Sequence, residues 1–123
     1  MPLSREFKHT VRERAERDPA FRLAMLQDAL AALNGGEAFE AKILLRDFIN
    51  ATVGFTELGE AIGRDSKSLM RTFSPSGNPT LETLTDVLRE LSQREGYVVK
   101  VEIPRASTST PRATARTRKA RAA

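Results

Sequence analysis

The spacing of glycines and apolar residues between Gly54 and Phe73 constrains the fold more than any other feature of the sequence. Gly59 lies inside a short apolar-periodic segment, Gly63 follows four residues later, and Leu69 follows six residues after that. A helix-turn-helix needs a small residue where its helices cross, a glycine at the turn and an apolar anchor on the second helix. The pattern therefore predicts two short helices on a tight turn.

The ends of these two helices also carry signals. Gly54 is the expected N-cap of the first helix, which Gly63 ends, and Asp65 is the expected N-cap of a second helix over 66–73. Met70 and Phe73 of the second helix are expected to pack inside the protein.

Apolar periodicity predicts four further helices, over about 4–16, 19–33, 37–51 and 81–94. Asp18-Pro19 is a helix start signal and Asn34-Gly35-Gly36 is a stop signal, so the first three of these helices are clearly separated. Phe39 and Leu81 are expected on the buried faces of their helices. The fold class is therefore mainly α.

The period changes after residue 96. Tyr97, Val99, Val101 and Ile103 alternate with other residues up to Pro104, which predicts one short β-strand over 97–103. A single strand leaves its backbone donors and acceptors unpaired, and no second strand pattern exists in the chain. Three partners stay open: the same strand of a second copy in an antiparallel ribbon, the sheet edge of another protein, or the surface of the preceding helix.

The basic character of the chain belongs to its end. Residues 1–103 hold 14 Lys and Arg against 16 Asp and Glu, whereas residues 104–123 hold six Lys and Arg and no acid. DNA binding therefore cannot be argued from the net charge of +4 alone. We expect three parts: an N-terminal helical region (1–53), a helix-turn-helix domain with its C-terminal strand (54–103) and a disordered basic tail (104–123). The tail is either a phosphate-binding extension or a solvated one.

Several function classes are disfavoured. There is no cysteine and only one histidine, His9, so disulfides and thiolate or multi-histidine metal sites are excluded. No nucleophile–base set or phosphate-binding loop is present, so we expect neither an enzyme nor a cofactor. The sequence contains no signal-peptide pattern and no run of about 20 apolar residues, which predicts a cytoplasmic protein without a membrane segment.

The second helix of the pair presents candidate base-reading residues. The candidates are polar or basic, and they lie on both sides of the apolar anchor Leu69 in the sequence: Ser66, Lys67 and Ser68 before it, and Arg71 after it. Arginine can bind guanine through two hydrogen bonds, and serine can bond to several bases. The N-terminal residues of such a helix usually contact base edges in the major groove.

The segment Ser-Leu-Met-Arg-Thr-Phe-Ser-Pro-Ser-Gly-Asn-Pro-Thr-Leu-Glu-Thr-Leu, over 68–84, resembles the addiction-module antidote proteins of the Xre/Cro-type helix-turn-helix superfamily. The resemblance covers about residues 54–103. It implies a lambda-repressor-like helix-turn-helix bundle with extra N-terminal helices, and a homodimer that binds operator DNA. It also implies phosphate contacts by Thr56, Ser76 and Asn78. Arg64 departs from the family, which usually has an aliphatic residue there; it either weakens the inner core or adds a phosphate contact.

Three functions follow. The first is a transcriptional regulator that represses its own toxin–antitoxin operon and neutralises an RNase-type toxin; the toxin is implied by the resemblance only. The second is a stand-alone, phage-type regulator without a toxin. The third is a helical interaction protein whose helix-turn-helix no longer binds DNA.

Overall fold

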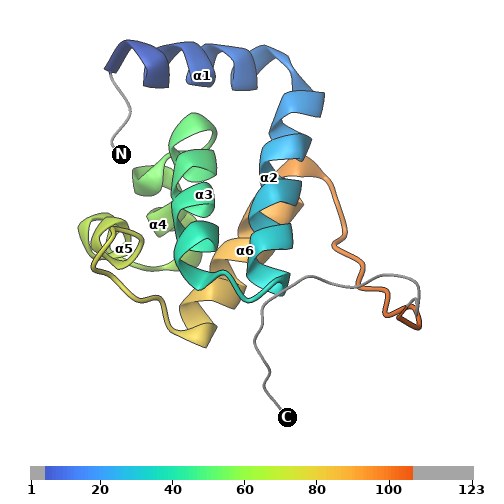
Figure 1. Ribbon diagram of the computed structural model, residues 1–123. Coiled ribbons are helices and arrows are strands. Elements are labelled where there is room, and N and C mark those ends of the chain that lie inside the picture. The colour runs from blue at the N-terminus through green and yellow to red at the C-terminus, as the bar shows by residue number, and fades with distance from the viewer. Residues whose placement is uncertain (1–4, 107–123) are drawn as a thin grey trace.

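The computed structural model describes residues 5–106, which form six helices and no β-strand. The helices are α1 (Arg5–Arg17), α2 (Pro19–Asn34), α3 (Ala38–Ala51), α4 (Phe55–Ile62), α5 (Ser66–Thr72) and α6 (Leu81–Glu95), as labelled in Figure 1. The protein is therefore mainly helical, as the periodicity predicts. The basic tail lies almost entirely outside the described residues, so its predicted disorder is not addressed by the structure.

Local capping explains where the helices begin. The Asp18 carboxylate accepts a hydrogen bond from the backbone N–H of Phe21 at 3.2 Å, and Pro19 occupies the first turn of α2, where its missing N–H costs nothing. The hydroxyl of Thr80 accepts from the N–H of Thr83 at 3.1 Å at the start of α6. Gly96, with φ of 80°, ends α6 in the left-handed conformation that glycine tolerates.

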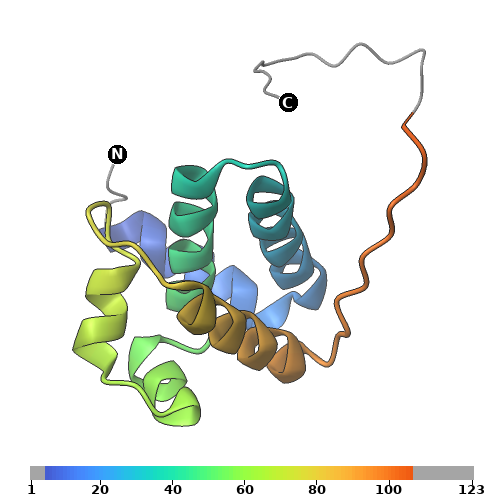
Figure 2. The same ribbon diagram turned by 90° about the horizontal axis from the view of Figure 1, so that it is seen from below.

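The helices pack around one hydrophobic core. In Figures 1 and 2, α2 and α3 run side by side, α6 lies across them, and the α4–α5 pair lies on the α3 side. Helix α1 crosses one end of this arrangement and contributes the fully buried Ala15. Every helix from α2 to α6 supplies the core, whose fully buried large side chains include Leu26, Leu45, Phe48, Ile49, Leu58, Phe73, Val87 and Leu91.

Two predictions of burial at the starts of helices are wrong. Phe39 is 59% exposed and Leu81 is 77% exposed. Phe39 lies in the first turn of α3 and Leu81 is the first residue of α6, so both stand on helix ends that extend past the core. The ammonium group of Lys42 lies 5.4 Å from the centre of the Phe39 ring, which gives that exposed ring a cationic neighbour.

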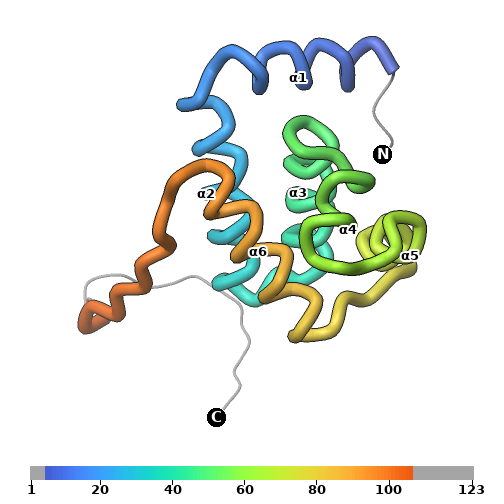
Figure 3. Tube along the Cα trace, turned by 180° about the vertical axis from the view of Figure 1, so that it is seen from behind, coloured from blue at the N-terminus to red at the C-terminus, as the bar shows by residue number. Residues whose placement is uncertain are grey.

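The predicted β-strand over 97–103 is also absent from the chain described here. The Tyr97 N–H donates to the carbonyl of Ser92 at 3.0 Å, and the following segment extends away from the helices, as Figures 2 and 3 show. A strand is defined by hydrogen bonds to a neighbouring strand, and residues 5–106 contain no other extended segment paired with this one.

No helix among the described residues has the length and apolar character needed to cross a membrane.

Candidate nucleic-acid interface

The α4–α5 pair is shaped by two glycines in conformations that other residues rarely adopt. Gly54, with φ of 84°, precedes α4, and Gly63, with φ of 72°, ends it in the left-handed region. After Gly63 the chain turns back, and the N–H of Arg64 donates to the carbonyl of Gly59 at 2.8 Å. The predicted helix end at Gly63 is confirmed.

Gly59 allows the turn to lie directly against α4. A Cβ at this position would lie 2.7 Å from the carbonyl oxygen of Arg64 and 3.3 Å from the Cα of Ser66. Both are backbone atoms, so a side chain could be accommodated only if the start of α5 moved away. The inner side of the pair is closed by Leu58 and Leu69, which are 0% and 2% exposed.

Asp65 caps α5 as the sequence predicts. Its Oδ2 accepts a hydrogen bond from the backbone N–H of Ser68 at 2.9 Å. This bond to the charged form of the carboxylate is the main reason that the pKa of Asp65 lies below its ordinary value of 3.8. Asp65 is therefore an anion at neutral pH, at the end of α5 that carries the predicted base-reading residues.

The outer face of α5 is polar and basic. Lys67, Ser68 and Arg71 are exposed, and Ser66 is half-buried at the first position of the helix. The Arg71 guanidinium donates to the Ser68 hydroxyl at 3.3 Å, so these two side chains meet on one face of the helix. The structure thus brings all four predicted base-reading residues together within two turns of one helix.

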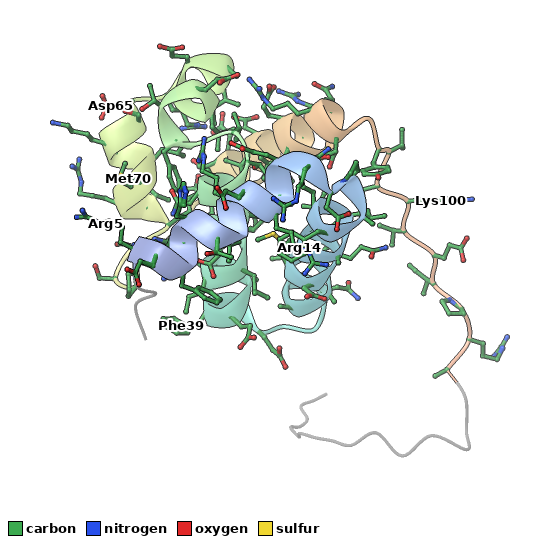
Figure 4. The ribbon with its side chains drawn as sticks, turned by 90° about the horizontal axis from the view of Figure 1, so that it is seen from above. Arg5, Arg14, Phe39, Asp65, Met70 and Lys100 are labelled. Carbon is green, nitrogen blue, oxygen red and sulfur yellow. The ribbon has the colours of Figure 1, made fainter. Side chains whose placement is uncertain are left out.

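Met70 and Phe73, the two residues predicted to pack inside the protein, differ in exposure. Phe73, just after the helix, is 1% exposed and packs against the Phe55 ring, with the ring centres 6.2 Å apart, so its predicted packing role is confirmed. Met70 is 47% exposed, and its predicted packing role is wrong. Figure 4 shows Asp65 and Met70 on α5 at the edge of the molecule. The exposed face of α5 therefore contains one flexible apolar side chain among its polar ones.

The predicted phosphate-binding residues lie on both sides of α5. Thr56 is exposed in the first turn of α4, and Ser76 and Asn78 are exposed in the loop between α5 and α6. Their exposure leaves them accessible to a ligand that lies along α5.

The loop that carries Ser76 and Asn78 is tied to the N-terminal half of the protein by Lys42. The Lys42 ammonium, on α3, donates to the carbonyl oxygens of Pro75 at 2.9 Å and Gly77 at 2.7 Å. This role could not be predicted from the sequence, because Lys42 precedes the loop by more than 30 residues and no motif links the two.

Gly77 has a second structural role in the same loop. A Cβ on Gly77 would collide with the carbonyl oxygens of Arg71 and Thr72, at the end of α5. The loop therefore folds directly against α5, and only glycine permits that approach. Its place between Ser76 and Asn78 fixes both side chains close to the C-terminal end of the helix.

Arg64 forms an ion pair with α6. Its guanidinium lies 3.2 Å from Asp86 Oδ2, and both side chains are about one-third exposed, at 33% and 28%. The Arg64 Nε is buried and has no hydrogen-bond partner in the described chain. The Asp86 carboxylate neutralises the charge of Arg64, and the pair joins the turn to α6. The structure tests neither of the two roles suggested for Arg64, a weaker inner core or a phosphate contact.

The described residues offer no obvious metal site: they contain no group of three or more His, Cys, Asp or Glu side chains that could hold an ion. Comparison with known proteins assigns no relatives: no protein-family model, no curated protein and no solved structure matches the chain.

Proposed function

We propose that this protein is a sequence-specific DNA-binding transcriptional regulator, in which the α4–α5 pair is a helix-turn-helix and α5 is the recognition helix. The observation that supports this most is the exposed face of α5. Lys67, Ser68 and Arg71 point to solvent from a helix whose opposite side is anchored by Leu69, 2% exposed. A solvent-facing helix held rigidly at its back is what insertion into a groove requires.

The dimensions of α5 suit a major groove. A helix of 7 residues is about 10 Å long, and the groove is about 12 Å wide. The exposed Arg71 guanidinium can donate two parallel hydrogen bonds to guanine, while the Ser68 hydroxyl, now in contact with Arg71, can accept or donate to a base edge. Thr56, Ser76 and Asn78 would bind the flanking phosphates and fix the register of α5 on the duplex.

The net negative charge of residues 1–103 favours binding by two recognition helices together. Residues 1–103 carry more acids than bases, and the ionised Asp65 stands at the start of α5. One recognition helix would therefore bind a polyanion weakly. A homodimer, which places two recognition helices about 34 Å apart on a palindromic operator, doubles the contacts and the specificity.

The wider role rests on the resemblance of residues 54–103 to addiction-module antidote proteins. On that basis the protein is a cytoplasmic antitoxin that also represses its own toxin–antitoxin operon. A stand-alone regulator without a toxin is the second candidate. The antitoxin role would be supported by a neighbouring reading frame that encodes a small basic protein, if that protein co-purifies with this one. Stable expression of this protein alone, with no co-purifying partner, would support the stand-alone regulator.

The DNA-binding proposal is tested with duplex DNA from upstream of the protein's own gene. Replacing Arg71 by alanine should weaken specific binding by about 1–3 kcal/mol, roughly 5- to 150-fold, and should relax specificity at one base pair. Arg17→Ala is the matched control, because Arg17 is an exposed arginine at the far end of α1, and it should bind like the unmodified protein. Unchanged binding by both Arg71→Ala and Lys67→Ala would contradict the proposal.

The contribution of the basic tail is separable in the same assay. A chain ending at residue 103 lacks six cations, and comparison at two salt concentrations measures how many phosphates they neutralise. If the tail binds phosphates, the shortened protein should lose affinity and show a shallower salt dependence on all sequences. If the tail is a solvated extension, the two proteins should respond to salt alike.

A further inference from the structure

Residues 97–103 hold the most exposed apolar side chains of the described protein. Val98 is 92% exposed, Ile103 90% and Val101 76%, whereas Tyr97 and Val99 are less exposed, at 38% and 47%. Valine and isoleucine are residues that favour β-structure, so this is a strand-forming sequence held in water. An extended segment of this kind, with its backbone groups unpaired, readily pairs with another strand.

The segment is also extended in the way that such pairing requires. Tyr97 is the last residue in the described chain whose N–H is bonded to another backbone group. Lys100 Nζ lies 3.8 Å from Glu102 Oε2, so the charged side chains two residues apart point to the same side. Alternation of faces at a period of two is the geometry of a strand.

A shallow apolar hollow lies at the start of the segment. It has a volume of about 390 Å³, and its lining includes Leu30 of α2, Leu88 of α6 and residues 97–99. Of these three residues, Tyr97 and Val99 are 38% and 47% exposed whereas Val98 is 92% exposed, so the odd-numbered side chains are the ones that the helices cover more at this end of the segment. In an extended chain Val101 and Ile103 continue the same face, so one side of a ribbon would be apolar from end to end.

Symmetry restricts how two identical segments can pair. In an antiparallel pair, residues that face each other have their side chains on the same side of the ribbon. When the two strands are identical and related by a two-fold axis, a residue and its copy also lie on the same side, so the axis must pass between one residue and its own copy. Centring the pair on Lys100 places two ammonium groups opposite each other, and centring it on Glu102 places two carboxylates opposite each other, which is unfavourable. Centring on Val101 places Lys100 opposite Glu102 of the second copy, twice, and Val99 opposite Ile103.

We propose that residues 97–103 pair with the same residues of a second copy, in an antiparallel two-stranded ribbon centred on Val101. This inference deepens the proposed function, because it supplies the dimer on which two-site operator binding rests. The two Lys100–Glu102 pairs select the register, and Val99, Val101 and Ile103 of both copies form its apolar face. That face continues over the hollow between α2 and α6.

Pro104 agrees with this register. It lies opposite Val98 of the second copy, and proline cannot donate a ladder hydrogen bond. If the Val101 pair is hydrogen-bonded, the pairs alternate outward, so the Lys100–Glu102 pairs and the Pro104–Val98 pairs are both of the non-hydrogen-bonded kind. Proline then interrupts no bond, and the charged pairs occupy the positions where facing side chains are closest.

Single cysteines test the register directly, because the natural chain has none. In the proposed ribbon the Cα atoms of the two Val101 residues are about 5.5 Å apart, within the range of about 4.4–6.8 Å that a disulfide spans. Under mild oxidation Val101→Cys should form a covalent dimer in high yield. Val99→Cys and Lys100→Cys should form little. A covalent dimer formed chiefly by Lys100→Cys or Val99→Cys would overturn the register.

Charge exchange gives an independent test by analytical ultracentrifugation of the full chain. Lys100→Glu places carboxylates opposite carboxylates at two symmetric positions and should weaken dimerisation roughly tenfold. The double change Lys100→Glu with Glu102→Lys should restore it. Lys67→Glu on α5 is the control and should leave dimerisation unchanged. A natural chain that stays monomeric at every accessible concentration, or a double variant as weak as the single one, would overturn the proposal.

These outcomes are distinct from a failure of DNA binding. A protein that cross-links at residue 101 and binds no DNA contradicts the proposed function and leaves the ribbon in place. A monomer that binds operator DNA does the reverse.

Discussion

The α4–α5 pair with its following loop differs from residues 97–103 in where its partners lie. The pair is determined by contacts inside the chain: Gly59 against Arg64, Asp65 on Ser68, and Lys42 on the loop carbonyls. Residues 97–103 have an equally clear sequence pattern, yet the apolar side chains Val98 and Ile103 are at least 90% exposed. A helix or strand pattern in the sequence forms that structure only where the same chain supplies the packing and hydrogen-bonding partners that the pattern needs.

The contrast predicts that substitutions in the two regions differ most in their effect on folding. Phe73→Ala removes a large side chain that is 1% exposed, and it should lower the free energy of unfolding by about 3–5 kcal/mol. Val98→Ala, at a site 92% exposed, should change it by less than about 0.5 kcal/mol in the monomer. Urea denaturation at low protein concentration measures both. Comparable losses would show that the C-terminal segment is part of the folded core.

The next largest effect is expected at Gly59. A glycine inside a helix usually costs about 0.5–1 kcal/mol relative to alanine, so Gly59→Ala would ordinarily stabilise a helix. Here the new Cβ meets the Arg64 carbonyl at 2.7 Å, and we expect a net loss of about 1–3 kcal/mol. Thermal unfolding followed by circular dichroism checks the sign. An increase in stability would mean that the turn is free to move away from α4.

A smaller effect is expected from the tie between α3 and the loop. Lys42→Met removes two hydrogen bonds to the carbonyls of Pro75 and Gly77 and should cost about 1 kcal/mol. Amide exchange of residues 74–80 should become faster than in the natural chain. Lys67→Met is the matched control, since it removes an exposed lysine of α5, and it should leave this exchange as it was.

The smallest effect concerns pH. The pKa of Asp65 is lowered in the folded protein, so its stabilising effect is fully present above the ordinary value of 3.8 and is lost as the pH falls through the folded value. Asp65→Asn retains a capping oxygen that does not titrate. The stability of the natural chain relative to this variant should therefore decrease as the pH falls below the ordinary value of 3.8. A difference that stays constant as the pH is lowered through this region would contradict the capping role of the carboxylate.

Helix positions were predictable because their signals are local. Asp18-Pro19, Gly63 and Asp65 act within one turn of their own position, and each is found where the sequence places it. Exposure at helix ends was less predictable: Phe39 and Leu81 fit the apolar period, but the core does not reach them. Periodicity describes a face of a helix, and it does not say how far along the helix the neighbouring elements extend.

Contacts between distant parts of the sequence were not predictable at all. Lys42 bonds to a loop more than 30 residues away, and Arg64 pairs with Asp86 of α6. Neither pair has a spacing that indicates contact, because only the packing of the helices brings the partners together. The candidate base-reading residues were predictable as a group, since they lie within one short helix.

The single core shared by α2 through α6 has a consequence for how the molecule responds to a ligand. Because Leu26, Phe48, Leu69 and Leu91 pack in one cluster, α5 cannot melt without exposing side chains of its neighbours. Any molecule that binds only to folded α5 therefore raises, by mass action, the temperature at which α2 and α3 unfold. A spectroscopic label on the first half of the chain would then report occupancy of a surface that it never touches.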